Sequence, residues 1–327
     1  MKRRTLTVRD ERWPIAGGFR IARGSKSEAE VVVAELLCDG VSGRGEATPY
    51  KRYGETVAGA LSLMESVRPA MEQGASRADL QGLLPAGAAR NALDCALWDL
   101  EAKRLGTSAW RIAGLDSMQP VTTLYTLSLD SPEAMARAAA KSGRPLLKLK
   151  LGDAGDLDRV SAVRQAAPAA RLVVDANEAL TFSALVELAP AFAKLGVEMI
   201  EQPLPAGEDA ALEGYDCPVL LCADESVHTR GELAACARRY GCVNVKLDKA
   251  GGLTEALALA AEARARGLAV MAGCMVATSL AMAPAMILAQ AADFVDLDGA
   301  MLLARDRLPG LAFDGSVIQP PSPDLWG

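Results

Sequence analysis

The stretch LLKLKLGDAGDLDRVSAVRQAAPAARLVVD, residues 146–175, contains one complete repeating unit of this chain. It opens on LLKLK at 146–150 and closes on RLVVD at 171–175, two short runs that are typical of buried strands. The segment between the two runs reads as a helix with a loop at each end. The stretch therefore predicts a strand, a helix and a second strand.

The same unit recurs from about position 120 onward, with β-rich runs about 22 to 26 residues apart. The runs begin at Thr122, Leu146, Arg171, Val197, Val219, Val243, Leu268 and Asp293. Eight near-equal units predict an α/β fold with a TIM-type (β/α)8-like barrel. An open doubly wound sheet uses similar units, but no Gly-rich fingerprint follows any of these runs, so we favour the closed barrel.

Residues 1–118 do not share this period and predict an N-terminal α+β capping domain. The expected elements are strands at 3–12 and 30–39, a turn at 40–45, and helices at 56–73 and 88–105. We expect the barrel to occupy residues 119–305. Residues 306–327 end in a proline-containing irregular stretch, and we expect this segment to pack back on the cap.

The composition indicates a folded acidic protein and argues against a nucleic-acid partner. Half of the residues are apolar, the net charge is −6 and the pI is about 5.1. Binding to phosphate backbones needs a basic face, and the one Lys/Arg-rich block, residues 1–4, is short. The seven cysteines include no C-x-x-C pair, which favours reduced thiols in the cytoplasm.

We expect neither a signal peptide nor a membrane partner. The charged residues 9–12 leave no room for the apolar core of a signal peptide. The longest uncharged run, 268–292, is long enough to cross a bilayer, but Gly273 and Pro284 divide it into a strand, a loop and a helix. The oligomeric state is left open, a homo-oligomer included.

Ionisable residues gather at the carboxyl ends of the strands, where the active sites of barrel enzymes form. Asp175, Glu201 and Asp224 end three consecutive strands, which lie about 4.8 Å apart, so we expect them to converge on Mg²⁺, with Mn²⁺ as a substitute. The alternative is a set of solvated carboxylates at loop starts. Three pairs are two residues apart, which predicts one strand face for each: Lys148 and Lys150, Lys246 and Asp248, and Asp296 and Asp298.

Lysines flank the expected metal site from the second and sixth strands. A lysine acts as a base only when its pKa is lowered, and nearby cations and partial burial lower it. Lys148, Lys150, Lys246 and the metal form such a cluster, although any single lysine could be a solvated surface residue. His228, the sole histidine, is interpreted as structural. Cys274 is interpreted as a pocket wall, since no histidine base accompanies it.

Taken in order, these segments resemble the enolase superfamily, muconate-lactonising subgroup. The resemblance is carried by LLKLK (Lys148, Lys150), VVDANE (Asp175), IEQPL (Glu201), CADES (Asp224), NVKLDKAGGLTEAL (Lys246), SGRGEATPYKRYGE and AARNALDCALWDL. Within the subgroup the chain is most similar to the dipeptide epimerases, closely to the L-Ala-D/L-Glu epimerases of Gram-negative bacteria. Asp296-Leu297-Asp298-Gly299 and Gly273-Cys274-Met275 carry that finer resemblance.

The resemblance implies a role for each site residue. Lys150 and Lys246 would exchange the roles of base and acid on the two faces of the α-carbon, and Lys148 would help to stabilise the enolate. Asp296 and Asp298 would bind the free ammonium of the dipeptide, and Met275 would contact the substrate.

A flexible cap loop at 17–27 would contact the substrate's side chain. We expect its Arg23, rather than Arg20 or Lys26, to meet the carboxylate of a Glu side chain, with residues 50–53 as a second candidate. One departure from the subgroup is Ala277, where many relatives carry an acid.

We therefore expect a Mg²⁺-dependent epimerase that interconverts L-Ala-L-Glu and L-Ala-D-Glu in the recycling of murein peptides. Two alternatives stay open. A lyase or cycloisomerase of the same superfamily, of the muconate cycloisomerase or o-succinylbenzoate synthase type, would need one essential base and no ammonium site. A non-catalytic ligand-binding barrel would lack catalytic groups.

Overall fold

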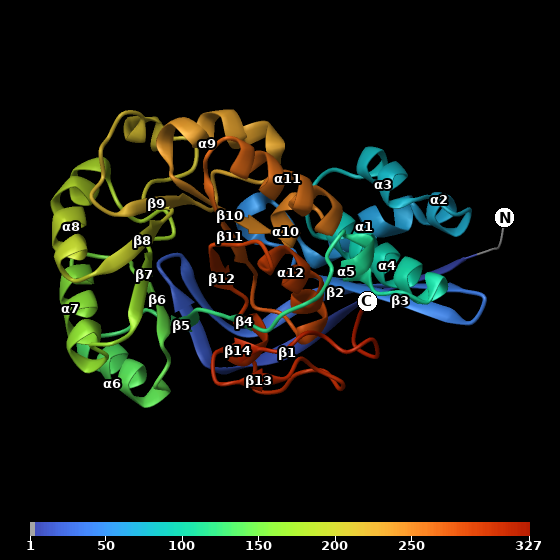
Figure 1. Ribbon diagram of the computed structural model, residues 1–327, viewed down its shortest axis with the longest axis horizontal. Coiled ribbons are helices and arrows are strands. Elements are labelled where there is room, and N and C mark those ends of the chain that lie inside the picture. Colours follow the sequence, from blue (N-terminus) through green and yellow to red (C-terminus); the bar gives the residue numbers. More distant parts are fainter. Residues whose placement is uncertain (1–3) are drawn as a thin grey trace.

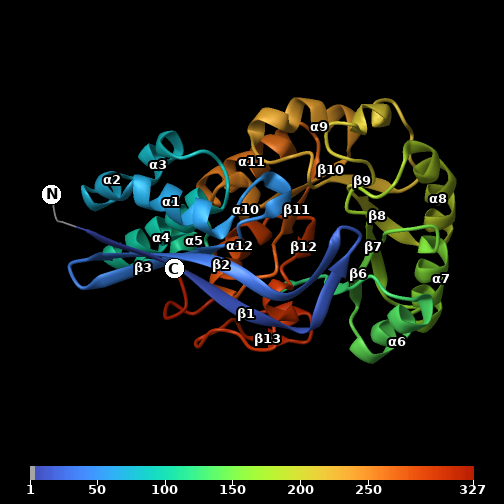
Figure 2. The ribbon, with the colours of Figure 1, turned by 180° about the vertical axis from the view of Figure 1, so that it is seen from behind.

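The computed structural model describes residues 4–327, so the basic residues Lys2 and Arg3 noted above lie outside the described residues. A barrel of parallel strands lies beside a cap built from the N-terminal part of the chain, drawn in blue and teal (Figure 1). Seen from behind, a long hairpin of the cap reaches across to the barrel (Figure 2). The carboxyl end of the chain lies against the cap.

Eight parallel strands form the barrel, and they follow one another around it in chain order. They are β5 (Tyr125–Leu127), β6 (Leu146–Lys150), β7 (Arg171–Asp175), β8 (Val197–Glu201), β9 (Leu220–Ala223), β10 (Cys242–Lys246), β11 (Ala269–Gly273) and β12 (Phe294–Asp296). The sheet closes on itself, because the amide of Leu124 donates to the carbonyl of Val295 over 2.8 Å. The predicted barrel is thus confirmed, and all eight strands lie at or close to the expected runs.

Helices cover the outside of the barrel (Figure 1). The helices in the barrel part of the chain are α6 (Pro132–Ser142), α7 (Asp156–Ala166), α8 (Phe182–Lys194), η2 (Asp209–Leu212), η3 (Arg230–Glu232), α9 (Leu233–Arg239), α10 (Leu247–Ala250), α11 (Leu253–Ala265), α12 (Ser279–Ala289) and η4 (Gly299–Leu302). The helix expected between β8 and β9 is reduced to the single turn η2, because Pro203, Pro205 and Pro218 interrupt that segment. The uncharged run 268–292 divides into β11, a loop and α12 as expected. None of the helices within residues 4–327 has the length and apolar character of a membrane span.

Side-chain alternation along the strands divides the barrel interior into an apolar floor and a charged layer above it. The floor consists of Leu124, Leu146, Val173, Met199, Cys222, Cys242 and Met271. Two residues further along the strands, Lys148 follows Leu146 and Asp175 follows Val173 on the same face. Lys150, Asp175 and Glu201 are register partners on β6, β7 and β8. The strand register therefore brings the charged residues together above a dry floor.

The cap consists of a three-stranded antiparallel sheet and the helices packed on it. Its elements are β1 (Thr5–Ile21), β2 (Gly24–Cys38), β3 (Val41–Ala47), η1 (Lys51–Tyr53), α1 (Val57–Ser66), α2 (Arg68–Glu72), α3 (Arg77–Leu83), α4 (Ala88–Leu105) and α5 (Ala109–Ile112). The helix expected at 88–105 is confirmed. The helix expected at 56–73 is broken at Val67, just ahead of Pro69, and α3 and α5 were not expected.

Residues 41–45 belong to β3, so the turn predicted at 40–45 is wrong except at Gly40. The turn is made by Asp39 and Gly40 alone, both with positive φ. Gly43 and Gly45 instead allow β3 to approach α4. A Cβ atom on Gly43 would lie 2.4 Å from the carbonyl oxygen of Ala96, and one on Gly45 would lie 2.1 Å from that of Ala92. These glycines serve helix–sheet packing rather than a turn.

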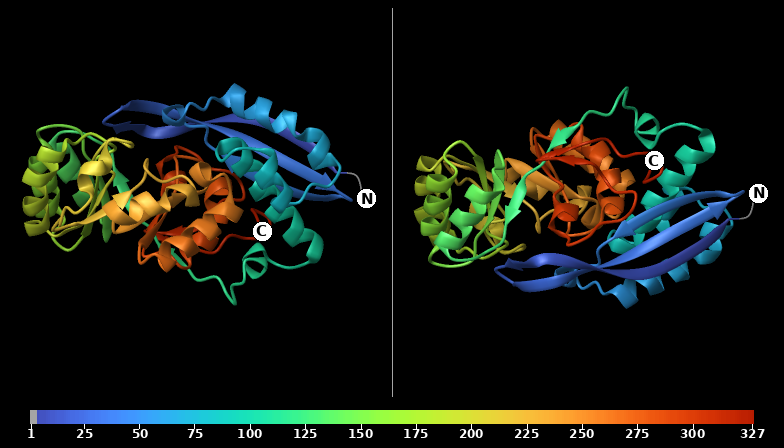
Figure 3. Two further views of the ribbon diagram at one scale, coloured as in Figure 1. Left: turned by 90° about the horizontal axis from the view of Figure 1, so that it is seen from above. Right: turned by 90° about the horizontal axis from the view of Figure 1, so that it is seen from below.

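The flexible loop predicted at 17–27 is instead the end of the β1–β2 hairpin. Phe19 pairs with Lys26 and Ile21 with Gly24, after a register shift between Pro14 and Phe19. The hairpin runs from the cap along the barrel in both views of Figure 3. Its turn at residues 22–23 therefore comes to rest over the carboxyl ends of the barrel strands.

The carboxyl-terminal segment forms a small sheet and then contacts α4. The sheet contains β4 (Val121–Thr122), β13 (Phe313–Asp314) and β14 (Val317–Ile318). The run expected to begin at Thr122 is thus shared between β4 and the barrel strand β5. The carboxyl-terminal segment, expected to be irregular, contains the two short strands β13 and β14. The indole of Trp326 donates to the carbonyl of Cys95 over 3.1 Å, which joins the segment to the cap.

Candidate active site

The charged layer of the barrel is centred on Lys148. Its ammonium group lies 2.7 Å from Glu201 Oε2, 2.8 Å from Asp296 Oδ2 and 3.1 Å from Asp175 Oδ2, and its side chain is 2% exposed. Burial alone would lower the pKa of Lys148, but Asp296, Glu201 and Asp175 raise it well above its usual value. Lys148 is therefore a fixed positive charge in the wall of the site.

Lys150 and Lys246 approach the same space from opposite sides of the barrel. β6 and β10 are four strands apart in an eight-stranded ring, so they face each other. Lys150 Nζ lies 2.5 Å from Asp175 Oδ2, and Lys246 Nζ lies 2.7 Å from Asp224 Oδ2. Burial opposes the charge on Lys246, and Asp224 and Glu201 nevertheless raise its pKa. Two lysines thus flank one central space.

Asp175 and Glu201 end the neighbouring strands β7 and β8, Asp224 directly follows the next strand, β9, and all three are buried. Each is oriented by another group. The amide of Asn177 donates to Asp175 over 2.9 Å, Asn244 donates to Glu201 over 2.9 Å, and Lys249 lies 2.5 Å from Asp224. The carboxylates are therefore held in place without help from solvent.

The three carboxylates fit a hard cation in their chemistry. The set is all oxygen, the ligand type that Mg²⁺ prefers. Burial and the negative charge of Asp175 raise the pKa of Glu201 to about 7. The buried Glu201 Oε2 has the ammonium group of Lys148 as its partner, 2.7 Å away. Among residues 4–327 no three acidic, histidine or cysteine side chains already surround one point at metal-binding distance. The lysine ammonium groups lie between the carboxylates instead.

Asp296 ends β12 and Asp298 follows it at the start of η4. Both carboxylates line the central cavity. Asp298 accepts a hydrogen bond of 2.6 Å from the amide of Thr126, and Asp296 Oδ1 is buried without a partner. Burial and Asp296 raise the pKa of Asp298 to about 7. The pair is brought together as expected, although only Asp296 belongs to the strand.

Asp248 does not belong to the site, so its expected pairing with Lys246 on one strand face is wrong. β10 ends at Lys246, and the chain turns into α10 before Asp248. The carboxylate accepts hydrogen bonds from the amide of Thr48 (2.8 Å) and the side chain of Asn91 (3.1 Å), both in the cap. Asp248 therefore joins the cap to the barrel.

A cavity of about 730 Å³ lies between the hairpin and the strand ends. Its barrel side includes Lys148, Lys150 and Lys246, and its cap side includes Phe19 and Lys26. Asp175 and Glu201 lie deeper, below this lining. The cavity can thus hold a small molecule with one end over the charged layer and the other under the hairpin.

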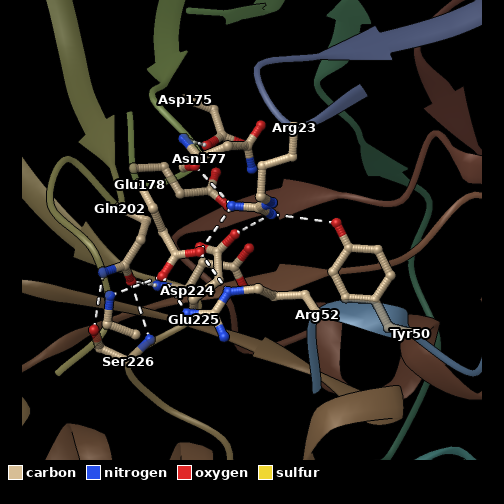
Figure 4. A network of polar contacts seen from close by, with 12 residues as sticks. Arg23, Tyr50, Arg52, Asp175, Asn177, Glu178, Gln202, Asp224, Glu225 and Ser226 are labelled. Atoms are coloured by element: carbon tan, nitrogen blue, oxygen red, sulfur yellow. Dashed lines mark hydrogen bonds and ion pairs between the residues drawn. The ribbon is translucent and has the colours of Figure 1, made fainter. Parts of the chain in front are cut away.

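Arg23 reaches this cavity from the hairpin, but its guanidinium is already bound. It lies 2.6 Å from Glu225 and 2.9 Å from Glu178, and it donates to the carbonyl of Asn177 over 2.7 Å (Figure 4). Arg20 does not line the cavity. Lys26 does, with its ammonium 5.0 Å from the ring centre of Tyr50, and it forms no ion pair within residues 4–327. Lys26 is therefore the hairpin cation left available to an anion.

The loop between β11 and α12 supplies another wall of the cavity. Cys274 and Met275 line it, whereas Ala277 is fully buried beneath. Burial raises the pKa of Cys274 well above its usual value, with Asp296 and Asp298 adding to the effect, which does not suit a nucleophile. His228 packs edge-on against Tyr53 with ring centres 4.3 Å apart and does not line the cavity.

Several polar residues of the site were not expected from the sequence. Lys249, Asn244 and Asn177 orient the three carboxylates, and Glu225 binds Arg23. Asn244 could have been found, since it lies two residues before Lys246 on the same strand face. Lys249 lies on the short helix α10, where strand periodicity no longer applies.

Known proteins match both the cap and the barrel part of the chain. The family model described as enolase C-terminal domain-like matches residues 131–314, and the model of the mandelate racemase / muconate lactonizing enzyme N-terminal domain matches residues 3–114. An L-Ala-D/L-Glu epimerase of Escherichia coli is 50% identical over 95% of this chain and 98% of its own length. An N-acetyl-D-glutamate racemase of Pseudoalteromonas is 43% identical over 87% of this chain and 91% of its own.

Solved structures are similar over almost the whole chain. An enolase family member from Agrobacterium tumefaciens, with homology to dipeptide epimerases and with bound sodium and L-Ala-L-Glu, has a TM-score of 0.97 and 48% identity and covers 99% of this chain and 100% of its own. A dipeptide epimerase from Methylococcus capsulatus with Mg and L-Arg-D-Lys has a TM-score of 0.90 and 31% identity, covering 98% of each chain.

Proposed function

Because this chain belongs to the mandelate racemase / muconate lactonizing enzyme family of the enolase superfamily, we propose that it is a Mg²⁺-dependent dipeptide epimerase. It inverts the α-carbon of the C-terminal residue, with L-Ala-L-Glu and L-Ala-D-Glu as the preferred pair. The observation that carries this proposal is the pair of lysines, Lys150 and Lys246, on facing strands of one cavity.

The two lysines explain inversion of a stereocentre. The proton next to a carboxylate is weakly acidic, because its removal leaves a doubly charged enolate. One lysine takes the α-proton from its side, and the other returns a proton from the opposite side, so the centre inverts. Lys148, a fixed positive charge, stabilises the negative charge that develops between them. When bound by Asp175, Glu201 and Asp224, Mg²⁺ supplies further positive charge that stabilises an enolate and favours neutral lysines nearby.

Asp296 and Asp298 suit the free ammonium of a dipeptide. Two buried carboxylates in a cavity wall attract a cation, and Asp296 Oδ1 has no hydrogen-bond partner of its own. The wall near Met275 would contact the N-terminal residue. At the hairpin end, Lys26 lines the cavity and would bind the side-chain carboxylate of a Glu residue, the role first expected of Arg23.

Racemisation of N-acetylglutamate is a second candidate, favoured by the 43% identity to an N-acetyl-D-glutamate racemase. That substrate keeps the α-carboxylate and the Glu side chain but carries no ammonium. The proton-transfer residues would therefore serve both substrates, and Asp296 and Asp298 would favour the dipeptide.

The test is α-proton exchange in deuterated water with Mg²⁺, read by mass over a library of L,L-dipeptides and N-acetyl amino acids. We expect incorporation of one deuteron into L-Ala-L-Glu together with formation of L-Ala-D-Glu. Exchange on N-acetylglutamate alone would select the second candidate. Absence of exchange on every compound would contradict both and favour the lyase or cycloisomerase alternative.

The biological setting follows from this substrate. A cytoplasmic L-Ala-D/L-Glu epimerase would act in the recycling of murein peptides, and the seven free cysteines suit a reducing compartment. The net charge of −6 gives no support for a nucleic-acid partner. Fractionation of cells into soluble and membrane parts, and gel filtration for a homo-oligomer, test these points.

A further inference from the structure

Arg23 connects the tip of the hairpin to two separate barrel loops. Its Nη1 contacts the carbonyl of Asn177 and the carboxylate of Glu178, which follow β7, and its Nη2 contacts Glu225, which follows β9. The hydroxyl of Tyr50 lies 3.2 Å from Nη2 (Figure 4). One side chain therefore joins segments that are about 150 and 200 residues apart in sequence.

The two barrel loops that Arg23 holds are those that orient two proposed metal ligands. Asn177 accepts from Arg23 through its carbonyl and donates through its amide to Asp175 Oδ1. Glu225 is the residue directly after Asp224. Asn177 and Glu178 both have positive φ, 44° and 71°, a backbone conformation that such residues keep only when their surroundings fix it.

Opening the hairpin would leave buried negative charge in these loops. The side chain of Glu225 is 1% exposed, and Arg23 is its ion-pair partner; no second one occurs within residues 4–327. Glu178 would keep Arg52, whose side chain is 39% exposed, as its ion-pair partner, together with the hydrogen bond of 2.7 Å from the amide of Ala206. Unpaired buried charge is costly, so the loops would rearrange or take up water when Arg23 leaves.

We propose that Arg23 is a positioning residue that couples closure of the β1–β2 hairpin to the geometry of Asp175 and Asp224. This inference rests on the metal-ligand set of the proposed function. It assigns Arg23 a role different from reading the substrate's side chain. Because coupling between two sites is reciprocal, hairpin closure strengthens metal binding and metal binding strengthens hairpin closure to the same degree.

The experiment compares the full chain with Arg23→Gln, Arg23→Lys and the control Arg12→Gln. Arg12 lies on the same strand β1, but its ion pair with Glu30 is exposed to solvent. The first measurement is Mg²⁺ affinity by calorimetry without substrate. The second is the rate of trypsin cleavage after Arg20 and Lys26 in the hairpin, with and without Mg²⁺, with the cut sites identified by mass.

We expect Arg23→Gln to weaken Mg²⁺ binding by about tenfold, within the usual range of coupling between sites. Mg²⁺ should slow hairpin cleavage in the unchanged chain and in Arg12→Gln, and should have little effect in Arg23→Gln. Arg23→Lys should lie between them, since lysine keeps the charge but not the forked geometry. Glu225→Gln should weaken Mg²⁺ binding as well. The double variant with Arg23→Gln and Glu225→Gln should lose less Mg²⁺ binding free energy than the sum of the losses in the two single variants.

The inference would be overturned if both Arg23→Gln and Glu225→Gln bound Mg²⁺ with unchanged affinity and if Mg²⁺ still slowed trypsin cleavage of the hairpin in both as much as in the unchanged chain. A rise in KM for L-Ala-L-Glu alone, with L-Ala-L-Leu unaffected, would return Arg23 to the role of side-chain reader. Failure of the proposed function is seen elsewhere, as absence of Mg²⁺ binding in the unchanged chain. If Arg23→Gln does not fold, Arg23→Lys and Glu225→Gln carry the same comparison.

Discussion

Lys150 and Lys246 enter the cavity as individual side chains with separate tasks, so each can be removed alone. Lys150→Ala and Lys246→Ala should each lower the rate of epimerisation by roughly 10²–10⁴-fold, the usual contribution of a general acid or base. Each variant should still exchange the α-proton of one substrate isomer with solvent deuterium. Nuclear magnetic resonance of L-Ala-L-Glu and L-Ala-D-Glu in deuterated water separates the two reactions. Normal epimerisation by either variant would contradict the two-base arrangement.

Lys26 is the residue on which the proposed preference for Glu depends. Lys26→Gln should raise KM for L-Ala-L-Glu by about tenfold or more, because a hydrogen bond between charged groups contributes about 1.5–3 kcal/mol. The KM for L-Ala-L-Leu should not rise, which makes that substrate the internal control. Steady-state kinetics on the two dipeptides decides the point. An equal change for both substrates would mean that Lys26 does not read the side chain.

At the scale of single elements, the approach of β3 to α4 depends on glycine. Gly45→Ala should lower the free energy of unfolding by roughly 1–3 kcal/mol, as expected for overpacking, since its Cβ would meet the carbonyl oxygen of Ala92 at 2.1 Å. Gly82→Ala is the matched control. It lies within α3 with open space around its Cβ position and should be neutral or stabilising by less than about 1 kcal/mol. Urea unfolding followed by circular dichroism measures both. Equal effects would refute the packing role.

The elements of the barrel were predictable, and those of the cap much less so. Six of the eight barrel strands are short, mostly apolar runs that end in a charged residue or directly before one, β5 and β11 being the exceptions. The type and position of these strands, and the barrel end at which their charges gather, could therefore be predicted from residues such as Lys150 and Glu201. Gly43 and Gly45 led to the wrong prediction of a turn, because glycine is equally suited to a turn and to the close approach of a strand to a helix. Phe19 on β1 and Lys26 on β2 pair near the end of a hairpin whose sequence, residues 17–27, contains three glycines and no apolar alternation, so a loop was expected.

The site was predictable where it follows strand ends and not where it depends on distant partners. Register alone brings Lys150, Asp175 and Glu201 together. The engagement of Arg23 by Glu225 depends on a contact 202 residues away, and no local pattern encodes it. Asp248 was misplaced because β10 ends at Lys246, and beyond that residue the two-residue period no longer applies.

For the whole molecule, Asp248 makes the union of cap and barrel sensitive to pH. Burial raises the pKa of this carboxyl from 3.8 to about 7, with Glu55 and Glu46 adding to the effect and hydrogen bonds from Thr48 and Asn91 opposing it. Between these values the folded protein retains a proton that the unfolded chain releases. The stabilising contribution of Asp248 is thus complete below about pH 4 and is lost as the pH rises through 7.

Asp248→Asn keeps the acceptor for Thr48 and removes the titration. We expect the free energy of unfolding of the unchanged protein to fall between pH 4.5 and pH 7.5 relative to that of Asp248→Asn. Urea unfolding of both proteins across this pH range, with chelator present in both samples, gives the difference between their free energies of unfolding. A constant difference between the two proteins at all pH values would show that Asp248 does not titrate.

Metal removal should also act on the whole molecule. Excess chelator should abolish proton exchange, and added Mg²⁺ or Mn²⁺ should restore it. At a Mg²⁺ concentration of about 100 times Kd, binding to the folded state alone should stabilise it by about 2.7 kcal/mol, a shift that thermal unfolding detects. Asp224→Asn should lose that stabilisation. Full activity in excess chelator would rule out the three carboxylates as ligands.

The closure of the barrel between β5 and β12 has a consequence for how the protein is made. Asp296 and Asp298 leave the ribosome nearly 150 residues after Lys148, whose counter-ion Asp296 is. Until β12 has been synthesised, the barrel lacks its last strand. The amides of Leu124 and Thr126 then lack their hydrogen-bond acceptors, Val295 and Asp298. A translation product that stops before residue 294 would therefore expose an open sheet edge and leave Lys148 without one of its three carboxylate neighbours, and it would be a ready substrate for the proteases that clear unfinished chains.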